Sequence, residues 1–300
     1  MSVLAGVWPV LPTPMNQSGV PLVADLDPLL RWSLADGVAG VVVMGLASEA
    51  LQLEEAERRR ATEAFLSAAR GRTRVIVGTT AASTEAACRL AQHAVRQGAT
   101  ALMVAPPTAG CEGAAGLLAH YRAVAAAAGD CPLMVQDAPQ FIGVEIDAAI
   151  AAELRAACPS MVAIKSEGVP AGLRARRLVE ALEGTGVGVH GGIAGLQAPE
   201  VYAAGAEGML PGAETPAQQA ELFALWRAGR LDEAMALYRR ILPLLAFEMQ
   251  SLGFVVACCK SLLYRLGVLS SEHSRIAPPL DDWSRATLFR HWEACIGRLP

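Results

Sequence analysis

Short apolar runs rich in Val, Ile and Leu alternate along the chain with longer stretches in which Ala, Leu, Glu and Arg recur. The short runs are apolar at nearly every position, which is typical of parallel strands buried on both faces. Eight of these runs are predicted to be strands: Val7–Leu11, Gly40–Met44, Arg74–Gly78, Ala101–Val104, Leu133–Gln136, Met161–Lys165, Gly186–His190 and Gly208–Leu210.

A helical pattern follows each predicted strand, with apolar positions recurring every three or four residues. The predicted helices are Ala24–Ala35, Glu54–Ala69, Ser83–Gln97, Gly113–Ala128, Asp147–Ala157, Ala171–Leu182, Ala198–Ala204 and Pro216–Ala228. Eight consecutive strand–helix units indicate a closed α/β barrel, the (β/α)₈ or TIM-barrel fold, rather than an open sheet.

The pattern changes after residue 228, where three helices follow one another without a strand between them. These are Leu231–Leu245, Ser251–Leu266 and Asp281–Ile296, and Pro278–Pro279 separates the last two. The sequence therefore predicts a barrel over residues 1–228, which holds the active site, and a C-terminal three-helix region over residues 229–300.

Composition narrows the class of protein. The chain has 300 residues, of which 53% are hydrophobic and 18% charged, and its net charge is −4. No basic run is present, which argues against a nucleic-acid partner. The first basic residue is Arg31, so the charged start of a secretory signal is missing, and apolar stretches such as Gly37–Ala47 are shorter than the ~20 residues of a membrane helix. We expect a cytoplasmic protein that binds no membrane.

Seven cysteines are scattered along the chain without a CxxC pair, and no histidine lies at zinc-ligand spacing from them. An odd, dispersed set does not form a disulfide framework. We expect reduced, mostly buried thiols, because free Cys usually packs as a small hydrophobic residue. The sequence predicts neither a metal nor a cofactor.

Lys165 and Lys260 are the only lysines among the 25 basic residues. Arg stays protonated, whereas a buried Lys can lose its proton and attack a ketone. Lys165 closes the apolar run Met161–Ile164, at the carboxyl end of the sixth strand, where barrel active sites lie. It is the candidate nucleophile, and the alternative is a lysine reaching solvent. Lys260 lies in the middle of a C-terminal helix and is expected to be a surface or interface charge.

Several segments resemble the dihydrodipicolinate synthase / N-acetylneuraminate lyase family, in the same order and over nearly the whole chain. They are Val10–Pro14, Gly45–Glu49, Gln136–Pro139 with Gly143, Ile164–Lys165 and Gly205–Gly212. The resemblance implies a class I lyase or aldolase that acts on pyruvate or another 2-oxo acid, some members being dehydratases. It also implies a homotetramer, and it makes Lys165 the Schiff-base lysine.

This chain departs from the family pattern at three places. Gln136 replaces the tyrosine that relays protons after strand five, and Leu46 and Ala47 replace the threonine pair that holds the substrate carboxylate. Thr108 lies near the position of a second tyrosine of the synthases. All four tyrosines fall on predicted helices: Tyr121, Tyr202, Tyr238 and Tyr264. Because a glutamine amide cannot shuttle protons near neutral pH, dihydrodipicolinate synthesis is not expected.

Two side chains are candidates for the lost functions. Glu167 lies two residues beyond Lys165, so strand alternation puts both on one face, and Glu167 is a candidate acid/base; the alternative is a loop carboxylate facing water. By the same alternation Gln136 points inward, where it joins Lys165 and Glu167 as a candidate catalytic-site residue that binds substrate through its amide. Asp137 points away to fix its loop. Ser48 either binds a carboxylate or caps the next helix.

Other loop residues carry weaker signals. With Ala47 and Ser48, we assign Gly191 and Gly192 to substrate binding, because glycines let a ligand approach the backbone. The GxGxxG string at Gly186–Gly191 lies across a strand, so a dinucleotide site is not expected. Glu49 is expected to brace the second loop rather than to catalyse.

Three functions compete at this stage. The first is a Schiff-base lyase, an aldolase or dehydratase, acting on a small-molecule 2-oxo acid as a homo-oligomer, dimer or tetramer. The second is a catalytically altered barrel that binds a small carboxylate without lyase turnover. The third, a phosphate-ligand barrel enzyme without an imine, is disfavoured because the loops after strands seven and eight contain no Lys or Arg.

Overall fold

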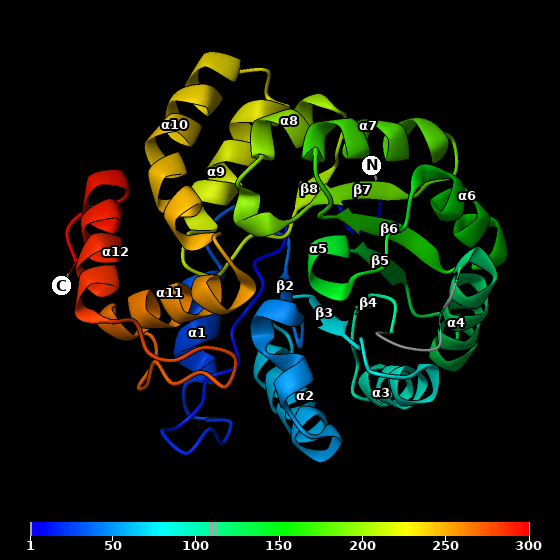
Figure 1. The fold of residues 1–300 in the computed structure, drawn as a ribbon, viewed down its shortest axis with the longest axis horizontal. Coiled ribbons are helices and arrows are strands. Elements are labelled where there is room, and N and C mark those ends of the chain that lie inside the picture. Colours follow the sequence, from blue (N-terminus) through cyan, green and yellow to red (C-terminus); the bar gives the residue numbers. More distant parts are fainter. Residues whose placement is uncertain (1, 108–110, 112, 300) are drawn as a thin grey trace.

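The computed structural model describes residues 2–107, 111 and 113–299 and contains one sheet of eight parallel strands (Figure 1). Strand β8 pairs with β1, and bridges from Val7 to Val38 and from Val10 to Val42 join β1 to β2, so the sheet closes into the predicted barrel. The strands are β1 Gly6–Val7, β2 Val41–Val43, β3 Val75–Gly78, β4 Ala101–Val104, β5 Leu133–Asp137, β6 Met161–Ser166, β7 Gly188–Gly191 and β8 Gly208–Met209.

The first strand is shorter than predicted, Gly6–Val7 instead of Val7–Leu11. The reason is Pro9, which has no N–H to donate to a neighbouring strand. Its carbonyl still accepts from Val42 N at 2.9 Å, and Val10 N donates to Pro211 O at 2.8 Å. The segment therefore runs along the barrel as expected, but with an interrupted ladder.

The strands are apolar at nearly every position because their two faces pack into two separate cores. Val42 and Ile76 point into the barrel, where they pack with Trp8, Met103 and other interior side chains. Their neighbours along the strands face the surrounding helices. Because successive side chains of a strand point to opposite faces, both faces of each strand need apolar residues.

Eight helices surround the strands at the predicted places (Figure 1). Their starts include capped ends, since Ser83 Oγ accepts from Ala86 N at 3.3 Å and an Asp147 carboxylate oxygen accepts from Ile150 N at 2.8 Å. The helices are α1 Leu26–Ser33, α2 Glu55–Ala69, α3 Thr84–Arg96, α4 Gly113–Ala128, α6 Ala148–Ala157, α7 Ala171–Ala181, α8 Ala198–Ala203 and α9 Pro216–Arg227.

Four short helical turns follow the carboxyl ends of three strands, and the sequence pattern did not predict them. They are η1 Leu46–Ser48, η2 Ala50–Gln52, α5 Pro139–Ile142 and η3 Ile193–Gly195. Left-handed backbone at non-glycine residues shapes these loops, with φ of 61° at Glu49 and 50° at Ala194. Such conformations depend on tertiary support, which hydrophobic periodicity does not reveal.

The C-terminal region consists of α10 Leu231–Glu248, α11 Leu252–Arg265 and α12 Asp282–Cys295. Helix α10 packs on α9, and α11 lies against η1, beside the carboxyl end of the barrel. Among the described helices, none is long and apolar enough on its own to cross a membrane; α10 and α11 meet that criterion only as a pair bent by 116°.

The seven cysteines are free thiols, as predicted. Five of them are buried; Cys131 is one of the two half-buried ones, and its partial burial raises its pKa to about 11. None of the seven thiols lines the cavity described below, so we interpret them as packing residues.

Candidate active site

Lys165 lies at the carboxyl end of β6 and is buried, with 5% of its surface exposed. Its Nζ is 2.9 Å from Glu167 Oε1, and Glu167 is 4% exposed. The alternation expected from the sequence thus continues past the end of the strand and brings both side chains to one face. Neither side chain faces water, so the solvent-facing alternatives for both residues are wrong.

Gln136 lies on β5 in register with Lys165 and is 1% exposed. Its Nε2 donates to Glu167 Oε2 at 2.6 Å. Because a carboxylate only accepts, the amide must turn its NH₂ group toward Glu167, which leaves Oε1 facing away. That oxygen is buried, and no described residue forms a hydrogen bond with it.

Backbone contacts hold Glu167 in place. Glu167 N donates to Asp137 O at 2.8 Å, and Ile193 N donates to Glu167 Oε1 at 3.3 Å. Gly192 leaves the space that this side chain occupies, because a Cβ at Gly192 would lie 2.5 Å from Glu167 Cγ.

The two glycines assigned to substrate binding have packing roles instead. Gly192 accommodates Glu167, and a Cβ at Gly191 would lie 2.6 Å from Met209 Cε. Neither glycine lines the cavity that contains Lys165; Ile193 and Ala194, the next residues, do. The assignment was wrong because a glycine has the same sequence signature whether a ligand or a protein side chain fills its space.

Asp137 points away from the cavity, as predicted, and fixes the loop after β5. One carboxylate oxygen accepts from Ile146 N at 3.0 Å and the other from Arg174 Nη2 at 2.7 Å. Burial raises the pKa of Asp137, while these hydrogen bonds and the Arg174 charge oppose the rise. The loop is tied to the site, since Gln140 Nε2 donates to Glu167 O at 2.6 Å.

A small cavity of about 50 Å³ contains the three polar side chains. Its wall combines residues of the barrel with residues of α5 and the C-terminal helices. The lining residues are Val10, Leu46, Ala47, Met103, Gln136, Phe141, Lys165, Glu167, Ile193, Ala194, Leu210, Pro211, Gly212, Met249, Leu252 and Val255. Ala47 belongs to the wall, as expected, but offers only a methyl group and its backbone.

Ser48 is not part of that wall. Its Oγ donates to Leu11 O at 2.6 Å and accepts from Gly45 N at 3.0 Å. Its carbonyl accepts from Thr13 Oγ1 at 2.7 Å. The prediction that Ser48 caps the next helix is wrong, because the N-cap residues of η2 and α2 are Glu49 and Glu54. The Ser48 hydroxyl instead binds the backbone of Leu11 and Gly45.

The cavity residues that the sequence analysis did not assign to the site include Phe141 of α5, Met249, and Leu252 and Val255 of α11. An apolar residue on a helix has the same pattern whether it faces a core or a ligand. The sequence contained no signal that would have placed them in the site.

No tyrosine is among the described residues that line the cavity. All four lie on helices, as predicted; the Tyr121 hydroxyl donates to Val104 O at 3.0 Å and the Tyr238 hydroxyl to Leu196 O at 2.6 Å. Thr108 lies outside the described residues. The proton relay of the family therefore has no tyrosine substitute in the described cavity wall.

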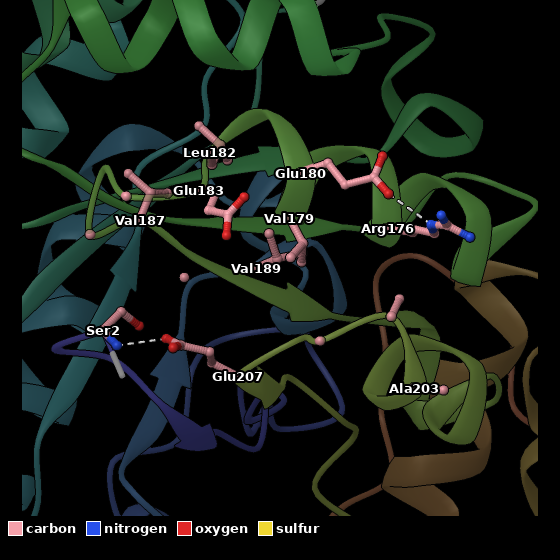
Figure 2. Close-up of a pocket in the computed structure, with 15 residues that line it drawn as sticks. Ser2, Arg176, Val179, Glu180, Leu182, Glu183, Val187, Val189, Ala203 and Glu207 are labelled. Atoms are coloured by element: carbon pink, nitrogen blue, oxygen red, sulfur yellow. Dashed lines mark hydrogen bonds and ion pairs between the residues drawn. The ribbon is translucent and has the colours of Figure 1, made fainter.

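A wider hollow of about 660 Å³ lies at the opposite end of the barrel (Figure 2). It is lined by the starts of β7 and β8 and by the loop from Leu182 to Val187. Ser2 N donates to Glu207 Oε2 at 2.6 Å within it. It holds no lysine, and in barrel enzymes the amino-terminal end of the strands contributes to stability rather than to catalysis.

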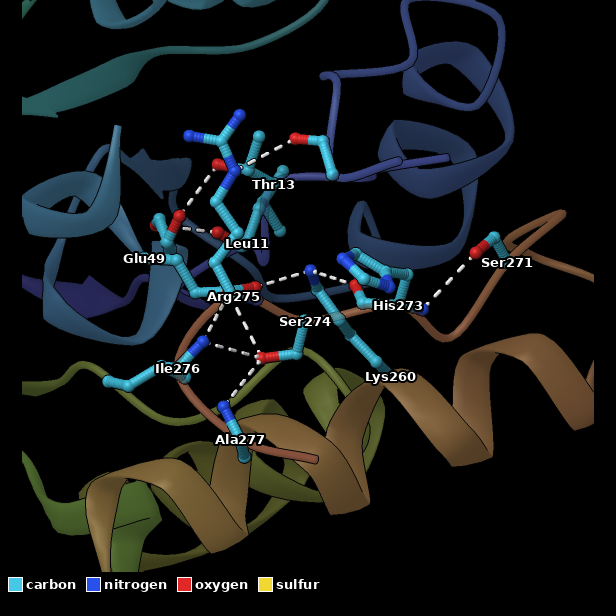
Figure 3. A network of polar contacts seen from close by, with 12 residues as sticks. Leu11, Thr13, Glu49, Lys260, Ser271, His273, Ser274, Arg275, Ile276 and Ala277 are labelled. Carbon is cyan, nitrogen blue, oxygen red and sulfur yellow. Dashed lines mark hydrogen bonds and ion pairs between the residues drawn. The ribbon is translucent and has the colours of Figure 1, made fainter. Parts of the chain in front are cut away.

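Lys260 is fully buried, so its predicted surface or interface role is wrong. Its Nζ forms an ion pair with Glu49 Oε1 and donates to His273 O at 2.8 Å (Figure 3). Burial lowers the pKa of Lys260, while the charge of Glu49 opposes this. The sequence could not show this partner, which lies more than two hundred positions away.

Glu49 braces its loop, as predicted, and does so by binding the C-terminal region. Its Oε2 accepts from Ser274 Oγ at 3.0 Å, Arg275 N at 2.6 Å and Ile276 N at 3.2 Å (Figure 3). The contact joins the loop after β2 to the segment that follows α11, and thereby holds two sides of the cavity wall together.

The closed barrel carries a buried lysine–carboxylate pair at its carboxyl end, where the active sites of barrel enzymes lie. The model of the "Dihydrodipicolinate synthetase family" matches residues 3–287, and the chain therefore belongs to that family. It is a lyase of that family, and the resemblance inferred from the five sequence segments is confirmed.

Two relatives and one solved structure illustrate the similarity. The chain is 32% identical over 241 residues to a 4-hydroxy-tetrahydrodipicolinate synthase of Acidiphilium cryptum (strain JF-5), covering 78% of this chain and 79% of the relative. It is 30% identical over 290 residues to an L-2-keto-3-deoxyarabonate dehydratase of Azospirillum brasilense, covering 94% and 92%. Dihydrodipicolinate synthase from Rhodopseudomonas palustris superposes with a TM-score of 0.90, 27% identity and 97% coverage of both chains.

Proposed function

We propose that the chain is a Schiff-base-forming aldolase or dehydratase that acts on a 2-oxo acid, with Lys165 as the imine-forming amine. The observation that carries this proposal is the buried contact of 2.9 Å between Lys165 Nζ and Glu167 Oε1 at the carboxyl end of β6. A buried amine beside a proton acceptor is the arrangement that nucleophilic attack on a ketone requires.

Glu167 supplies the acid/base chemistry in this proposal. It takes a proton from the Lys165 ammonium group, and the neutral amine attacks the ketone carbon to give a carbinolamine. The protonated Glu167 then returns the proton to the carbinolamine hydroxyl, which leaves as water and yields the iminium ion. Gln136 holds Glu167 in position but moves no proton, because an amide does not titrate near neutral pH.

The iminium ion then withdraws electrons from the bond that breaks. In aldol cleavage, Glu167 would take the proton of a hydroxyl on C4, and the C3–C4 electron pair would move toward the iminium nitrogen. In dehydration, Glu167 takes a proton from C3 to give the enamine and returns it to the C4 hydroxyl, which leaves as water when the C4–O bond breaks. Both reactions need one base beside Lys165, and Glu167 is the carboxylate in the cavity wall. We do not propose the synthase reaction, because Gln136 replaces the relay tyrosine.

The carboxylate of the substrate must be bound without a threonine pair. Leu46 and Ala47 line the cavity at that position, and their side chains cannot donate hydrogen bonds. We propose that the backbone N–H of Ala47 contributes to this subsite.

Borohydride trapping tests the imine. Incubation with pyruvate and borohydride should add the mass of one reduced adduct, and a Lys165→Arg variant should not be labelled. Lys260→Arg is the control, because it removes the other lysine but keeps a cation opposite Glu49, and it should still be labelled. Labelling that persists in Lys165→Arg would refute the proposal.

The second candidate function is a barrel that binds a small carboxylate without lyase turnover. The replacement of the relay tyrosine by Gln136 favours it. It predicts ligand binding without carbon–carbon or carbon–oxygen cleavage, so product analysis on 2-oxo acids that trap Lys165 separates the two candidates.

We further propose a homo-oligomer, dimer or tetramer, in the cytoplasm, on the basis of family membership. Light scattering on the purified chain tests the assembly, since a monomer at working concentration would refute it.

A further inference from the structure

The cavity around Lys165 is predominantly apolar. Of its side chains, Lys165, Glu167 and Gln136 are polar, and these three already bind one another. The rest of the wall consists of aliphatic, methionine and phenylalanine side chains with Ala, Pro and Gly. No Ser, Thr, Tyr, Asn, His, Arg or Asp contributes to the described wall.

Such a wall discriminates between substrates by their hydroxyl groups. A hydroxyl moved from water into an apolar site loses its hydrogen bonds, and the loss is not repaid unless the site provides a partner. A 2-oxo acid with several hydroxyls would face Phe141, Leu252 and Val255, whose side chains neither donate nor accept hydrogen bonds. A hydrocarbon tail would instead be stabilised by burial in the same place.

One buried acceptor in this wall is unused. Gln136 Oε1 has no hydrogen-bond partner, because the amide turns its NH₂ group to Glu167. Buried polar atoms in proteins are nearly always hydrogen-bonded, so an orphaned carbonyl oxygen in a cavity wall points to a donor on the ligand. It suits a single hydroxyl close to the reacting carbon atoms.

We propose that the substrate is a 2-oxo acid with one hydroxyl on C4 and a hydrocarbon tail beyond it. In the bound substrate the hydroxyl donates to Gln136 Oε1, which leaves Glu167 free to take the C3 proton in dehydration, and the tail packs against Phe141, Leu252 and Val255. This inference rests on the proposed function, in which Lys165 forms the imine. It makes the α5 turn and the start of α11 the determinants of specificity.

Two ligands of equal chain length test the inference: 4-hydroxy-2-oxohexanoate and 4,5,6-trihydroxy-2-oxohexanoate. They differ in the two hydroxyls that would lie against the apolar wall. The readout is the ligand concentration that gives half-maximal borohydride adduct on the parent protein. We expect this concentration to be at least about tenfold lower for the monohydroxy acid, since each unpaired buried hydroxyl weakens binding.

A pair of variants tests whether the cavity-facing side of α11 sets this ligand preference. Val255→Thr places a hydroxyl in the cavity wall at nearly unchanged volume. It should reduce the preference for the monohydroxy over the trihydroxy acid several-fold. Val256→Thr is the matched control, because Val256 is also buried in α11 but does not line the cavity, and it should leave the preference for the monohydroxy acid unchanged. Circular dichroism and the pyruvate adduct check that both variants fold.

The two possible failures are distinguishable. If pyruvate labels Lys165 but the trihydroxy acid binds as tightly as the monohydroxy acid, or more tightly, this inference is overturned and the imine proposal stands. If neither pyruvate nor either test acid labels Lys165, the proposed function fails and the inference fails with it. The comparison of ligands on the parent protein decides the matter even where a variant is unstable.

Discussion

Glu167 and Gln136 act as a pair on Lys165, and their roles differ. Glu167 Oε1 contacts the amine, while Oε2 accepts from the Gln136 amide. A carboxylate between an amine and an amide can exchange a proton with the amine only. We therefore expect the rate of imine formation to depend on Glu167 and the affinity for the ligand to depend on Gln136.

Glu167→Gln should slow imine formation by about 10²–10⁴-fold, the usual contribution of a positioned acid/base. Gln136→Ala should instead leave Lys165 trappable and weaken ligand binding by about 0.5–1.5 kcal/mol, the value of one hydrogen bond. Stopped-flow trapping with pyruvate gives the rate, and calorimetry gives the affinity. Imine formation at the parental rate in Glu167→Gln would assign the proton transfer to another group.

Buried polar contacts hold the loop after β2 against α11 and the segment that follows it. Glu49, in the loop, forms a buried ion pair with Lys260 of α11. Its other carboxylate oxygen accepts hydrogen bonds from Ser274, Arg275 and Ile276 in the segment after α11. Glu49 adopts φ of 61°, which the surrounding contacts hold in place. We infer that this contact keeps α11, with Leu252 and Val255, over the cavity.

Lys260→Met should lower the free energy of unfolding by about 3–5 kcal/mol, because it leaves the buried Glu49 carboxylate without its cation. The double variant Lys260→Met with Glu49→Gln should recover part of that loss, since it removes both charges. Urea denaturation of the single and double variants measures the difference. Equal stability of parent and Lys260→Met would show that the pair does not hold the two elements together.

The barrel and the C-terminal helices also enclose a pair of carboxyl groups. Glu214, after β8, and Glu248, at the end of α10, are both fully buried. Burial raises the pKa of Glu248 well above its ordinary value, and the neighbouring Glu214 raises it further. The folded protein thus keeps Glu248 protonated at pH values at which the unfolded chain ionises it, so the stability of the whole molecule should depend on pH.

The sign follows from the raised pKa. Above the unfolded pKa of about 4.5, the unfolded state loses a proton that the folded state retains, so stability falls as pH rises. Glu248→Gln removes this penalty, and its gain in melting temperature over the parent should grow between pH 5 and pH 8. Glu233→Gln, an exposed carboxylate, is the control and should show no such growth. A gain that is independent of pH would contradict the assignment.

The order of the elements and the position of Lys165 could be predicted from the sequence. Hydrophobic periodicity is a local property, and eight consecutive strand–helix units leave few arrangements other than a closed barrel. Strand alternation placed Lys165 and Glu167 on one face because it depends only on neighbouring residues. It also turned Gln136 inward and Asp137 outward for the same reason.

The partners of these residues were decided by the tertiary structure alone. The cation that neutralises Glu49 lies on a C-terminal helix, and the protein groups that occupy Ser48 and Gly192 come from other loops. Met249, Leu252 and Val255 line the cavity only because α10 and α11 meet over the barrel. Apolar pattern determines which side of a helix is buried, whereas contacts between distant segments determine whether that side meets a core or a ligand.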